Sequence, residues 1–414
     1  MARPSVVAVL RERGIRGLLQ AVIRRIRGGS RAQEHHHIHI DDISRNARGV
    51  DVVGFFTAEH GVGEAARTLV SALRTTDVEI STINYTDTES RTDHFFVTDD
   101  VSRHRTLLMS INADQLVVAR DRLGDHFFED RYVIGQWFWE LEIAPTWYRP
   151  AWPIVNELWA PTRFIESMLK NHAPGNVVIH HVPLPIVPPR VDDSLTRPRW
   201  NLDGRYMFLF VFDLMSIMKR KNPLGLISAY SKAFSENDGA QLVIKTMNGD
   251  KRADDLTLLL NAATSRSDIT IINEVFTSTE TSTLISLADC YVSLHRSEGL
   301  GLTLSEAMSL GKPVIATDYS GNTDFMTDAN SFLIPWTRVP VGEGAGGYDP
   351  AATWADPDEE AAVDAMRFVF KNQQEARIRG ARAREDVLGG HSQAAAGAIM
   401  KSRLEEIWRS HRGH

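Results

Sequence analysis

The sequence predicts an α/β protein built from two doubly wound parallel sheets that face a central cleft. Three observations favour this fold. The chain has 414 residues, which suits two domains. Short apolar strands alternate with helices in two separate blocks, and a proline-rich segment lies between the blocks. Since open α/β sheets bind ligands at the carboxyl ends of their strands, the cleft between the two sheets is the expected functional site.

Residues 1–48 are expected to form a basic amphipathic arm and a linker. Residues 1–31 carry eight arginines and one acid, so this segment has a net charge of +7 and the remaining residues carry −14. Apolar residues from Ile15 to Ile26 recur at three- and four-residue spacing, which is typical of a helix with one apolar face. Two interpretations stay open: the helix lies on an anionic membrane surface, or it packs on the body of the protein.

The first domain is predicted over residues 49–190. Its helices are expected at residues 63–73 and 163–171, and its strands at residues 52–57, 78–84, 106–112, 131–137, 157–160 and 177–180. Residues 183–199 contain five prolines, a composition that disfavours helix and sheet. This segment is therefore the predicted connection to the second domain.

The second domain is predicted over residues 200–390. Its strands are expected at residues 206–212, 241–245, 269–272, 290–294 and 313–317, and its helices at residues 223–234, 256–265, 279–288 and 304–310. This alternation, like that of the first block, predicts a Rossmann-like domain. Residues 391–414 are expected to form a closing helix, for which a return to the first domain is one option.

The composition disfavours several classes of protein. The acidic body argues against nucleic-acid binding. No apolar run reaches the roughly 18 to 20 residues of a membrane span, and the N-terminus lacks the apolar core of a secretory signal. The single cysteine, Cys290, excludes an intrachain disulfide and is expected to be buried. We therefore expect a cytoplasmic protein without a multi-cysteine metal site, with the arm as a candidate contact to the inner face of the membrane.

The most informative motif runs from Ser297 to Met308, after a predicted strand and into a predicted helix. A helix N-terminus offers unpaired N–H groups and the positive end of a dipole. Gly299 and Gly301 allow the backbone to approach a phosphate or a sugar. Glu298 lies on the loop and can accept hydrogen bonds from sugar hydroxyls, and Glu306 follows eight positions later on the helix.

This motif resembles that of the family four glycosyltransferases, in which two glutamates separated by seven residues precede an alanine, a glycine and a Pro-Val strand. Ala307, Gly311, Pro313 and Val314 match this pattern. The resemblance implies the GT-B fold and a retaining, metal-independent transferase that needs no cofactor. Such an enzyme moves a hexose or deoxyhexose from a nucleoside diphosphate sugar to a carbohydrate acceptor, here a cell-surface glycan or a glycolipid.

The resemblance also implies roles for individual residues. Glu298 would contact the donor sugar and Glu306 the ribose hydroxyls. The backbone of the glycine loop would meet sugar or phosphate; this loop comprises Gly299, Leu300, Gly301 and Leu302. The segment 319–326 resembles a subgroup whose acceptors are cell-surface glycans, with a structural loop and helix cap as the alternative.

The cations for a diphosphate depart from the family pattern, because Asp213 occupies the position where relatives usually carry an arginine. A guanidinium suits a diphosphate best, so Arg220 is the first candidate, followed by Lys221. Lys245, at the end of the next strand, is the candidate that replaces the missing arginine. Two further residues complete the predicted donor side: Ser216, and Val275 near the expected position of the base. For each cation the alternative is an ordinary solvated surface residue.

Two segments of the first domain are candidates for the opposite wall of the cleft. His60, Gly61 and Gly63 follow the opening strand and start a helix. In the resembled family this loop faces the donor diphosphate and the acceptor, whereas a purely structural turn is the alternative. Glu140 stands beside three aromatic residues at a strand end and is a candidate for contact with acceptor or donor sugar. Trp137 and Trp139 are acceptor-side candidates, with core packing as the alternative.

Two other functions remain open for this fold. A sugar-nucleotide epimerase would act on the donor alone and need no acceptor. A non-catalytic adaptor would keep the fold and bind partners through the arm, although the intact pair Glu298 and Glu306 argues against a decayed site.

Overall fold

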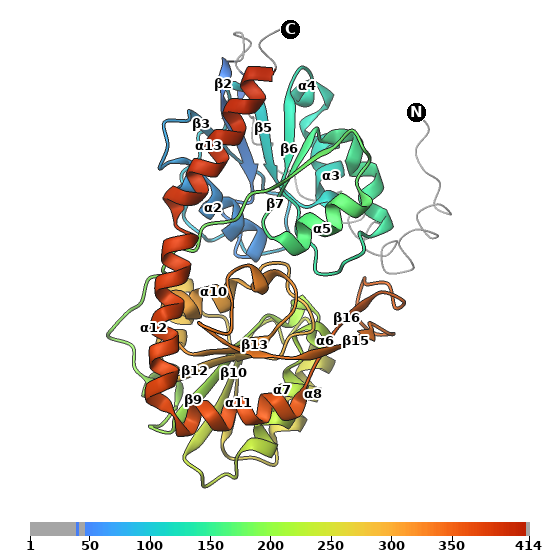
Figure 1. The fold of residues 1–414 in the computed structure, drawn as a ribbon. Helices are drawn as coiled ribbons and strands as arrows, with labels where there is room; N and C mark the ends of the chain where they lie inside the picture. Colours follow the sequence, from blue (N-terminus) through green and yellow to red (C-terminus); the bar gives the residue numbers. More distant parts are fainter. Residues whose placement is uncertain (1–38, 41–45, 411–414) are drawn as a thin grey trace.

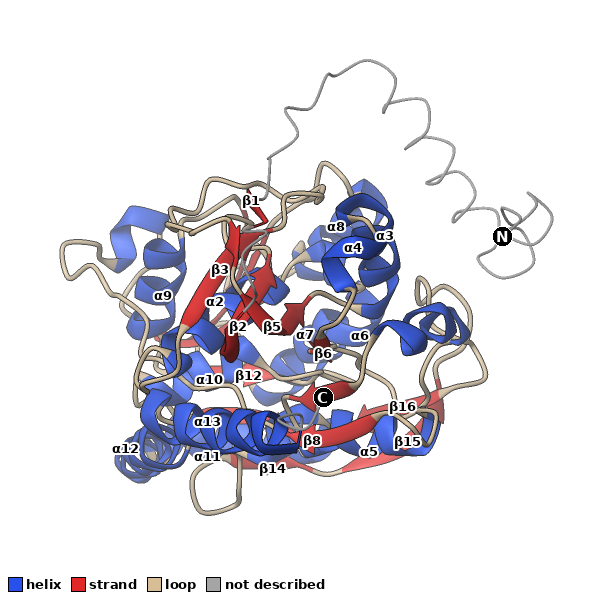
Figure 2. Cartoon of the chain, turned by 90° about the horizontal axis from the view of Figure 1, so that it is seen from above, coloured by secondary structure: helices blue, strands red, loops and turns tan. Residues whose placement is uncertain are grey.

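A computed structural model describes residues 39–40 and 46–410, which form two α/β domains stacked end to end (Figure 1). The predicted fold class is confirmed, because each domain is built on a six-stranded parallel sheet. Helices lie on both sides of the strands when the molecule is seen from above (Figure 2). Most of the predicted arm lies outside the described residues. The two interpretations of its apolar face, membrane contact and packing on the protein, therefore stay predictions.

The sheet of the first domain has the strand order β3-β2-β5-β6-β7-β8. Residues 49–56, in its first strand β2 and the turn that follows, are all buried, as expected for a parallel strand covered on both faces. The strands are β2 (Asn46–Gly54), β3 (Ile80–Asn84), β5 (His104–Ser110), β6 (Tyr132–Gly135), β7 (Glu157–Ala160) and β8 (Val178–His181). The helices are α2 (Gly61–Leu73), α3 (Ala113–Leu123), α4 (Asp125–Phe128), η1 (Thr146–Ile154) and α5 (Arg163–His172), and β1 (His39–Ile40) pairs with β4 (Val101–Ser102).

The sheet of the second domain has the order β11-β10-β9-β12-β13-β14. This is the order of a Rossmann fold, in which the first and fourth strands lie side by side at the switch point. Its strands are β9 (Tyr206–Val211), β10 (Ala240–Thr246), β11 (Ile269–Asn273), β12 (Cys290–Ser293), β13 (Val314–Thr317) and β14 (Phe332–Ile334). Cys290 is buried in β12, and burial raises the pKa of its thiol, which fits a structural cysteine.

The helices of the second domain agree with most of the predicted positions and add several that were not predicted. They are η2 (Arg197–Trp200), η3 (Leu214–Ser216), α6 (Met218–Lys221), α7 (Pro223–Ala233), α8 (Ala253–Ala263), α9 (Ser278–Leu287), α10 (Leu302–Ser309), η4 (Gly321–Asp324) and α11 (Glu359–Lys371). Among the described residues no helix is long and apolar enough to cross a membrane.

The C-terminal helices connect the two domains along one side of the molecule (Figure 1). α12 (Gln373–Gly390) packs on the second domain, and α13 (Gln393–Ser410) packs on the first. Met400 and Leu404 of α13 are fully buried in the same apolar cluster as Leu69 and Val70 of α2. The last helix of the chain therefore completes a hydrophobic core of the first domain.

A β-hairpin that the sequence analysis did not predict extends from the second domain toward the first. It consists of β15 (Trp336–Pro340) and β16 (Thr353–Pro357), which pair antiparallel. The loop between them contains three glycines with positive φ: Gly342, Gly344 and Gly346. Tyr348 and Trp354 belong to the same apolar cluster as Trp139 of the first domain. The hairpin thus contributes to the contact between the domains.

Candidate functional site

The predicted glycine loop lies at the carboxyl end of β12 and leads directly into α10. Gly301 has φ +86°, a conformation that disfavours side chains, and it is the residue that precedes the helix. The helix starts two residues earlier than predicted, at Leu302. Its free N–H groups therefore begin beside the loop that carries Glu298, as the phosphate-binding interpretation requires.

Glu298 is buried and lies between two cations. Its Oε1 accepts a hydrogen bond from Lys221 Nζ at 2.5 Å, and its Oε2 lies 3.1 Å from Arg220 Nη1. The strand order explains this contact, because β9 and β12 are neighbours and the segments that follow them meet at the switch point. Burial by itself raises the pKa of Glu298, but Lys221 and Arg220 outweigh it and lower the pKa to about 2.

Arg220 lies deeper than the sequence predicted. Its side chain is only 6% exposed, and its Nη1 donates a hydrogen bond of 2.8 Å to the carbonyl of Ser297. Its Nη2 lies 3.7 Å from Glu140 Oε1 of the first domain. Lys221 is also largely buried, and burial lowers its pKa. Both predicted cations therefore already have carboxylate partners.

Lys245 is the predicted cation that has no carboxylate partner. It lies at the end of β10 and is 3% exposed, and its Nζ stands 4.9 Å from the centre of the Phe276 ring. In the described part of the chain its ammonium group makes no hydrogen bond or ion pair. Burial lowers the pKa of Lys245 to about 8, although Asp213 acts in the opposite direction. This arrangement is suited to an anionic ligand that completes the charge.

Asp213 occupies the position where the resembled family has an arginine, and its carboxylate has a local structural role. Its Oδ1 accepts hydrogen bonds from the backbone N–H of Met215 at 2.9 Å and from Asn248 at 2.8 Å. Ser216 ends the short helix η3 that this contact caps. Val275, the residue before Phe276, is 53% exposed. Ser216 in η3 and Val275 in a loop therefore lie at the carboxyl edge of the second sheet.

The turn after β2 in the first domain faces α10. His60 caps α2, with its Nδ1 accepting a hydrogen bond of 3.1 Å from the N–H of Gly63. Burial and the nearby Arg67 lower the pKa of His60 to about 4, so this ring is neutral at pH 7. A Cβ at Gly63 would lie 2.7 Å from two backbone oxygens, whereas a Cβ at Gly61 would meet only Leu302, at 3.6 Å. Gly63 is thus required by packing, and Gly61 is the glycine nearest the opposite wall.

Glu306 lies on α10, close enough to Glu64 of α2 for the two carboxylates to repel each other. Burial and the carboxylate of Glu64 raise the pKa of Glu306 to about 7. Glu64 itself pairs with Arg67 at 2.8 Å, and Glu306 makes no ion pair within the residues that the structure describes. A ligand that donates hydrogen bonds, such as a sugar diol, would satisfy this carboxylate.

We expect the substitution Glu306→Gln to remove a loss of stability at neutral pH. The pKa of Glu306 in the folded chain, about 7, lies above its ordinary value of 4.5. The protonated form is therefore favoured by folding: the folded chain is most stable, with respect to this group, below pH 4.5. The free energy of unfolding falls as the pH rises from 4.5 through 7. Glutamine does not ionise, so urea unfolding at about pH 5 and about pH 8 should differ less for the variant than for the wild type. Equal pH dependence of the two proteins would contradict the assignment.

The acceptor-side prediction for Trp137 is wrong. Its indole is fully buried, and its ring packs on Tyr148 at 5.3 Å and Trp152 at 5.0 Å between ring centres. Trp139 is 8% exposed and donates its indole N–H to the carbonyl of Ile143. Both rings therefore form the apolar support below Glu140 and do not present a flat surface to a sugar.

Two residues with unusual backbone conformations flank the charged cluster, which consists of Glu140, Arg220, Lys221 and Glu298. Ile217, a β-branched residue, has φ +64° immediately before the short helix that carries Arg220 and Lys221. Ser320 has φ +76°, and its Oγ accepts a hydrogen bond of 2.8 Å from the N–H of Glu298. Such conformations cost roughly 1 to 3 kcal/mol each and concentrate at functional sites.

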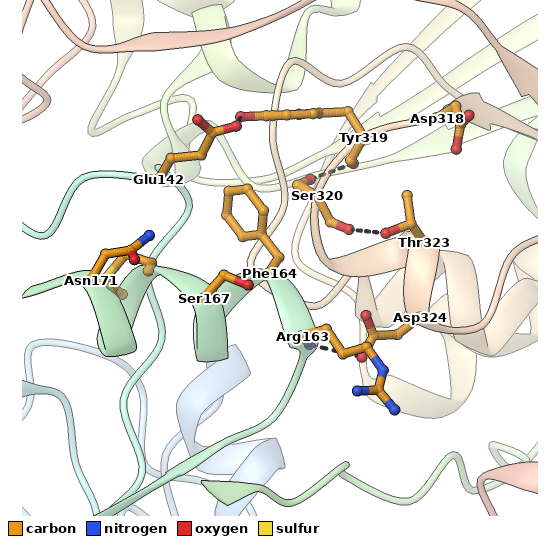
Figure 3. A pocket seen from close by; sticks show the side chains of 11 residues that line it. Glu142, Arg163, Phe164, Ser167, Asn171, Asp318, Tyr319, Ser320, Thr323 and Asp324 are labelled. Atoms are coloured by element: carbon orange, nitrogen blue, oxygen red, sulfur yellow. Dashed lines mark hydrogen bonds between the residues drawn. The ribbon is translucent and has the colours of Figure 1, made fainter. Parts of the chain in front are cut away.

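A cavity of about 590 Å³ lies between α5 and the segment 318–324, next to the charged cluster. Ser320 belongs to both, since it lines the cavity and contacts Glu298. Figure 3 shows Tyr319 reaching across the cavity to Glu142, to which its hydroxyl donates a hydrogen bond of 3.0 Å. Asp324 accepts a hydrogen bond of 2.9 Å from the backbone N–H of Arg163, so this wall also connects the domains.

Comparison with known proteins agrees with this geometry. Residues 197–340 match the family model for glycosyl transferases group 1. Sucrose-phosphate synthase from Thermosynechococcus elongatus has a similar structure, with a TM-score of 0.64 at 13% identity over 88% of this chain and 100% of that chain. HepE of Anabaena in complex with UDP-glucose also has a TM-score of 0.64, at 11% identity over 87% of this chain and 100% of that chain. No curated protein sequence matches this chain significantly.

The two facing α/β domains have the GT-B fold of these solved structures. The match to the model for glycosyl transferases group 1 lies in the second domain and includes Glu298, Glu306 and Lys245. The sequence resemblance to this group is confirmed.

Proposed function

We propose that this protein transfers a hexose or deoxyhexose from a nucleoside diphosphate sugar to a carbohydrate hydroxyl, with retention of configuration. The observation that carries the proposal is the buried Lys245, at the edge of the same sheet as the glycine loop. Among residues 39–40 and 46–410 it has no anionic partner. A diphosphate bound there would receive charge from Lys245 and N–H groups from the start of α10. Retention is supported by the resemblance to the family four motif alone.

The charged cluster supports an electrostatic mechanism. Departure of a nucleoside diphosphate leaves negative charge on phosphate, and preorganised cations and helix N-termini stabilise such charge. Lys245 and Lys221 would do so here, while Arg220 holds the loop of Glu298 in place through the carbonyl of Ser297. Glu298, whose pKa of about 2 keeps it ionised, would accept hydrogen bonds from donor-sugar hydroxyls. Glu306 would accept those of the ribose. In this proposal no metal takes part.

A thermal-shift screen of nucleoside diphosphate sugars tests the proposal. UDP-glucose is the first probe, because HepE of Anabaena has been solved in complex with it. A ligand at 100 times its dissociation constant stabilises the folded state by about 2.7 kcal/mol. Sugar release from the stabilising donor is then followed with a panel of glycan and glycolipid acceptors, with and without EDTA. Absence of a shift with every nucleotide sugar would contradict the proposal.

The same assay separates transfer from epimerisation, the second function open to this fold. A transferase forms a new glycosidic bond only when an acceptor is present. Formation of an isomeric nucleotide sugar without acceptor would favour the epimerase instead.

We further propose that the arginine-rich residues 1–31 bring the enzyme to the anionic inner face of a membrane. The test is cosedimentation with liposomes of mixed anionic and neutral lipids. The full chain should sediment and a chain that begins at Gly49 should not. Equal sedimentation of the two would refute the proposal.

A further inference from the structure

Tyr348, in the loop of the β15–β16 hairpin, reaches the charged cluster from the second domain. Its hydroxyl donates a hydrogen bond of 3.0 Å to Glu140 Oε2 in the first domain. Its ring packs edge-on against Trp139 at 5.2 Å and Trp354 at 6.2 Å between ring centres. Tyr348 is 7% exposed, so both the ring and the direction of the hydroxyl are fixed by packing.

Glu140 is held by the second domain at three points. Tyr348 contacts one carboxylate oxygen, and Arg220 Nη2 stands 3.7 Å from the other. The backbone carbonyl of Glu140 accepts a hydrogen bond from Ser297 Oγ, one residue before Glu298. Because Arg220 also contacts Glu298 at 3.1 Å, a continuous series of polar contacts runs from Tyr348 to Glu298.

We propose that Tyr348 is a positioning residue for the transfer reaction, which orients Glu140 and thereby fixes Arg220 against Glu298. This inference rests on the proposed function. The hydroxyl keeps its proton and can donate it to Glu140, because burial raises the pKa of Tyr348 well above its ordinary value. Without the hydroxyl, Glu140 Oε2 loses its donor and the carboxylate can rotate away from Arg220. The guanidinium of Arg220 then loses its contact with Glu140 and can shift relative to Glu298.

The structure offers a matched control in Tyr230 of α7. This buried tyrosine also belongs to the second domain, and its hydroxyl also donates a hydrogen bond of 3.0 Å to a carboxylate, that of Asp268. Asp268 pairs with Arg266 at 2.6 Å and precedes β11, at the edge of the sheet opposite the glycine loop. The two substitutions to phenylalanine therefore remove the same kind of hydrogen bond, but only Tyr348→Phe affects the charged cluster.

The test compares Tyr348→Phe, Glu140→Gln, their double variant and Tyr230→Phe in the full chain. The readouts are transfer kinetics with the nucleotide sugar that gives the largest thermal shift, and the thermal shift with UDP alone. We expect Tyr348→Phe to lower kcat about tenfold, the scale of one hydrogen bond to a charged group. The shift with UDP should be unchanged, because Lys245 does not touch this chain of contacts. Tyr230→Phe should keep its kcat within about twofold.

The double variant distinguishes a positioning role from a loss of packing. If Tyr348 acts through Glu140, adding Tyr348→Phe to Glu140→Gln should change kcat by less than about twofold. Additive losses in the double variant, or a kcat of Tyr348→Phe equal to that of Tyr230→Phe, would overturn the inference and leave the proposed function standing. Failure of the wild type to transfer sugar would overturn both.

Discussion

Substitution of Glu298 by glutamine is expected to lower kcat for sugar transfer about 100- to 1,000-fold, the scale of removing one preorganised electrostatic contact. Glutamine retains the size of the side chain but removes the negative charge that Lys221 and Arg220 share. Because the pKa of Glu298 is about 2, the wild-type carboxylate is ionised throughout the neutral range and the loss should not depend on pH there.

The measurement is steady-state kinetics together with thermal unfolding, which establishes that the variant is folded. Glu142→Gln is the control, since Glu142 also lies at the interdomain contact but pairs with the exposed Arg338. It should retain wild-type kcat within about twofold. If Glu298→Gln transfers sugar at the wild-type rate, the assignment of Glu298 to the donor sugar is wrong.

Substitution of Lys245 by methionine is expected to weaken binding of the donor nucleotide and at the same time to stabilise the ligand-free protein. A hydrogen bond to a charged group contributes about 1.5 to 3 kcal/mol, so the dissociation constant for UDP should rise about 10- to 150-fold. The pKa of Lys245 falls from 10.5 to about 8 in the folded chain. This difference means that the charged lysine lowers the stability of the folded chain by roughly 3 kcal/mol. Methionine carries no charge and removes this loss of stability.

The sign of the pH dependence follows from the same shift. At pH values below 8 the lysine is charged in both the folded and the unfolded chain, so the destabilisation is complete; it fades as the pH rises toward 10.5. The stabilisation by Lys245→Met should therefore be largest near pH 7 and should shrink in alkaline solution. Titration calorimetry with UDP and urea unfolding at several pH values measure the two effects separately.

Lys312→Met is the matched control for Lys245→Met. Burial also lowers the pKa of Lys312, but this lysine follows α10 and precedes β13, at the edge of the sheet opposite the cleft. The control should gain stability and bind UDP with wild-type affinity. If Lys245→Met binds UDP as tightly as the control does, Lys245 does not hold the diphosphate.

The glycine loop was predicted closely because its signal is local. A strand, two glycines and an amphipathic helix follow one another within 20 residues, and each depends mainly on its nearest neighbours. The start of α10 was predicted at Leu304, two residues late, because leucines at 300, 302 and 304 do not mark one helix start. The helix begins at Leu302, directly after Gly301 with its positive φ. Turn chemistry, and not periodicity, sets this boundary.

The hairpin and Trp137 show where local patterns fail. In the first strand of the hairpin, Trp336 and Val339 are partly buried, whereas Thr337 and Arg338 are exposed. Apolar and polar residues therefore do not alternate in the way that predicts a strand. Trp137 belongs to an aromatic segment that could line a cleft or a core. The rings of Tyr148 and Trp152 enclose it, and they reach it only when η1 folds back on the sheet.

The sequence by itself determined the two α/β domains, the position of the glycine loop and the residues that could carry charge at the cleft, because strand-helix alternation and turn residues act over short distances. Only the tertiary structure decided which charges are paired. Lys221 and Glu298 are 77 positions apart, and Tyr348 and Glu140 are 208 apart, so their contacts depend on strand order and on the approach of the domains. The same packing leaves Lys245 buried beside an aromatic ring without an acidic partner, which no local pattern predicts.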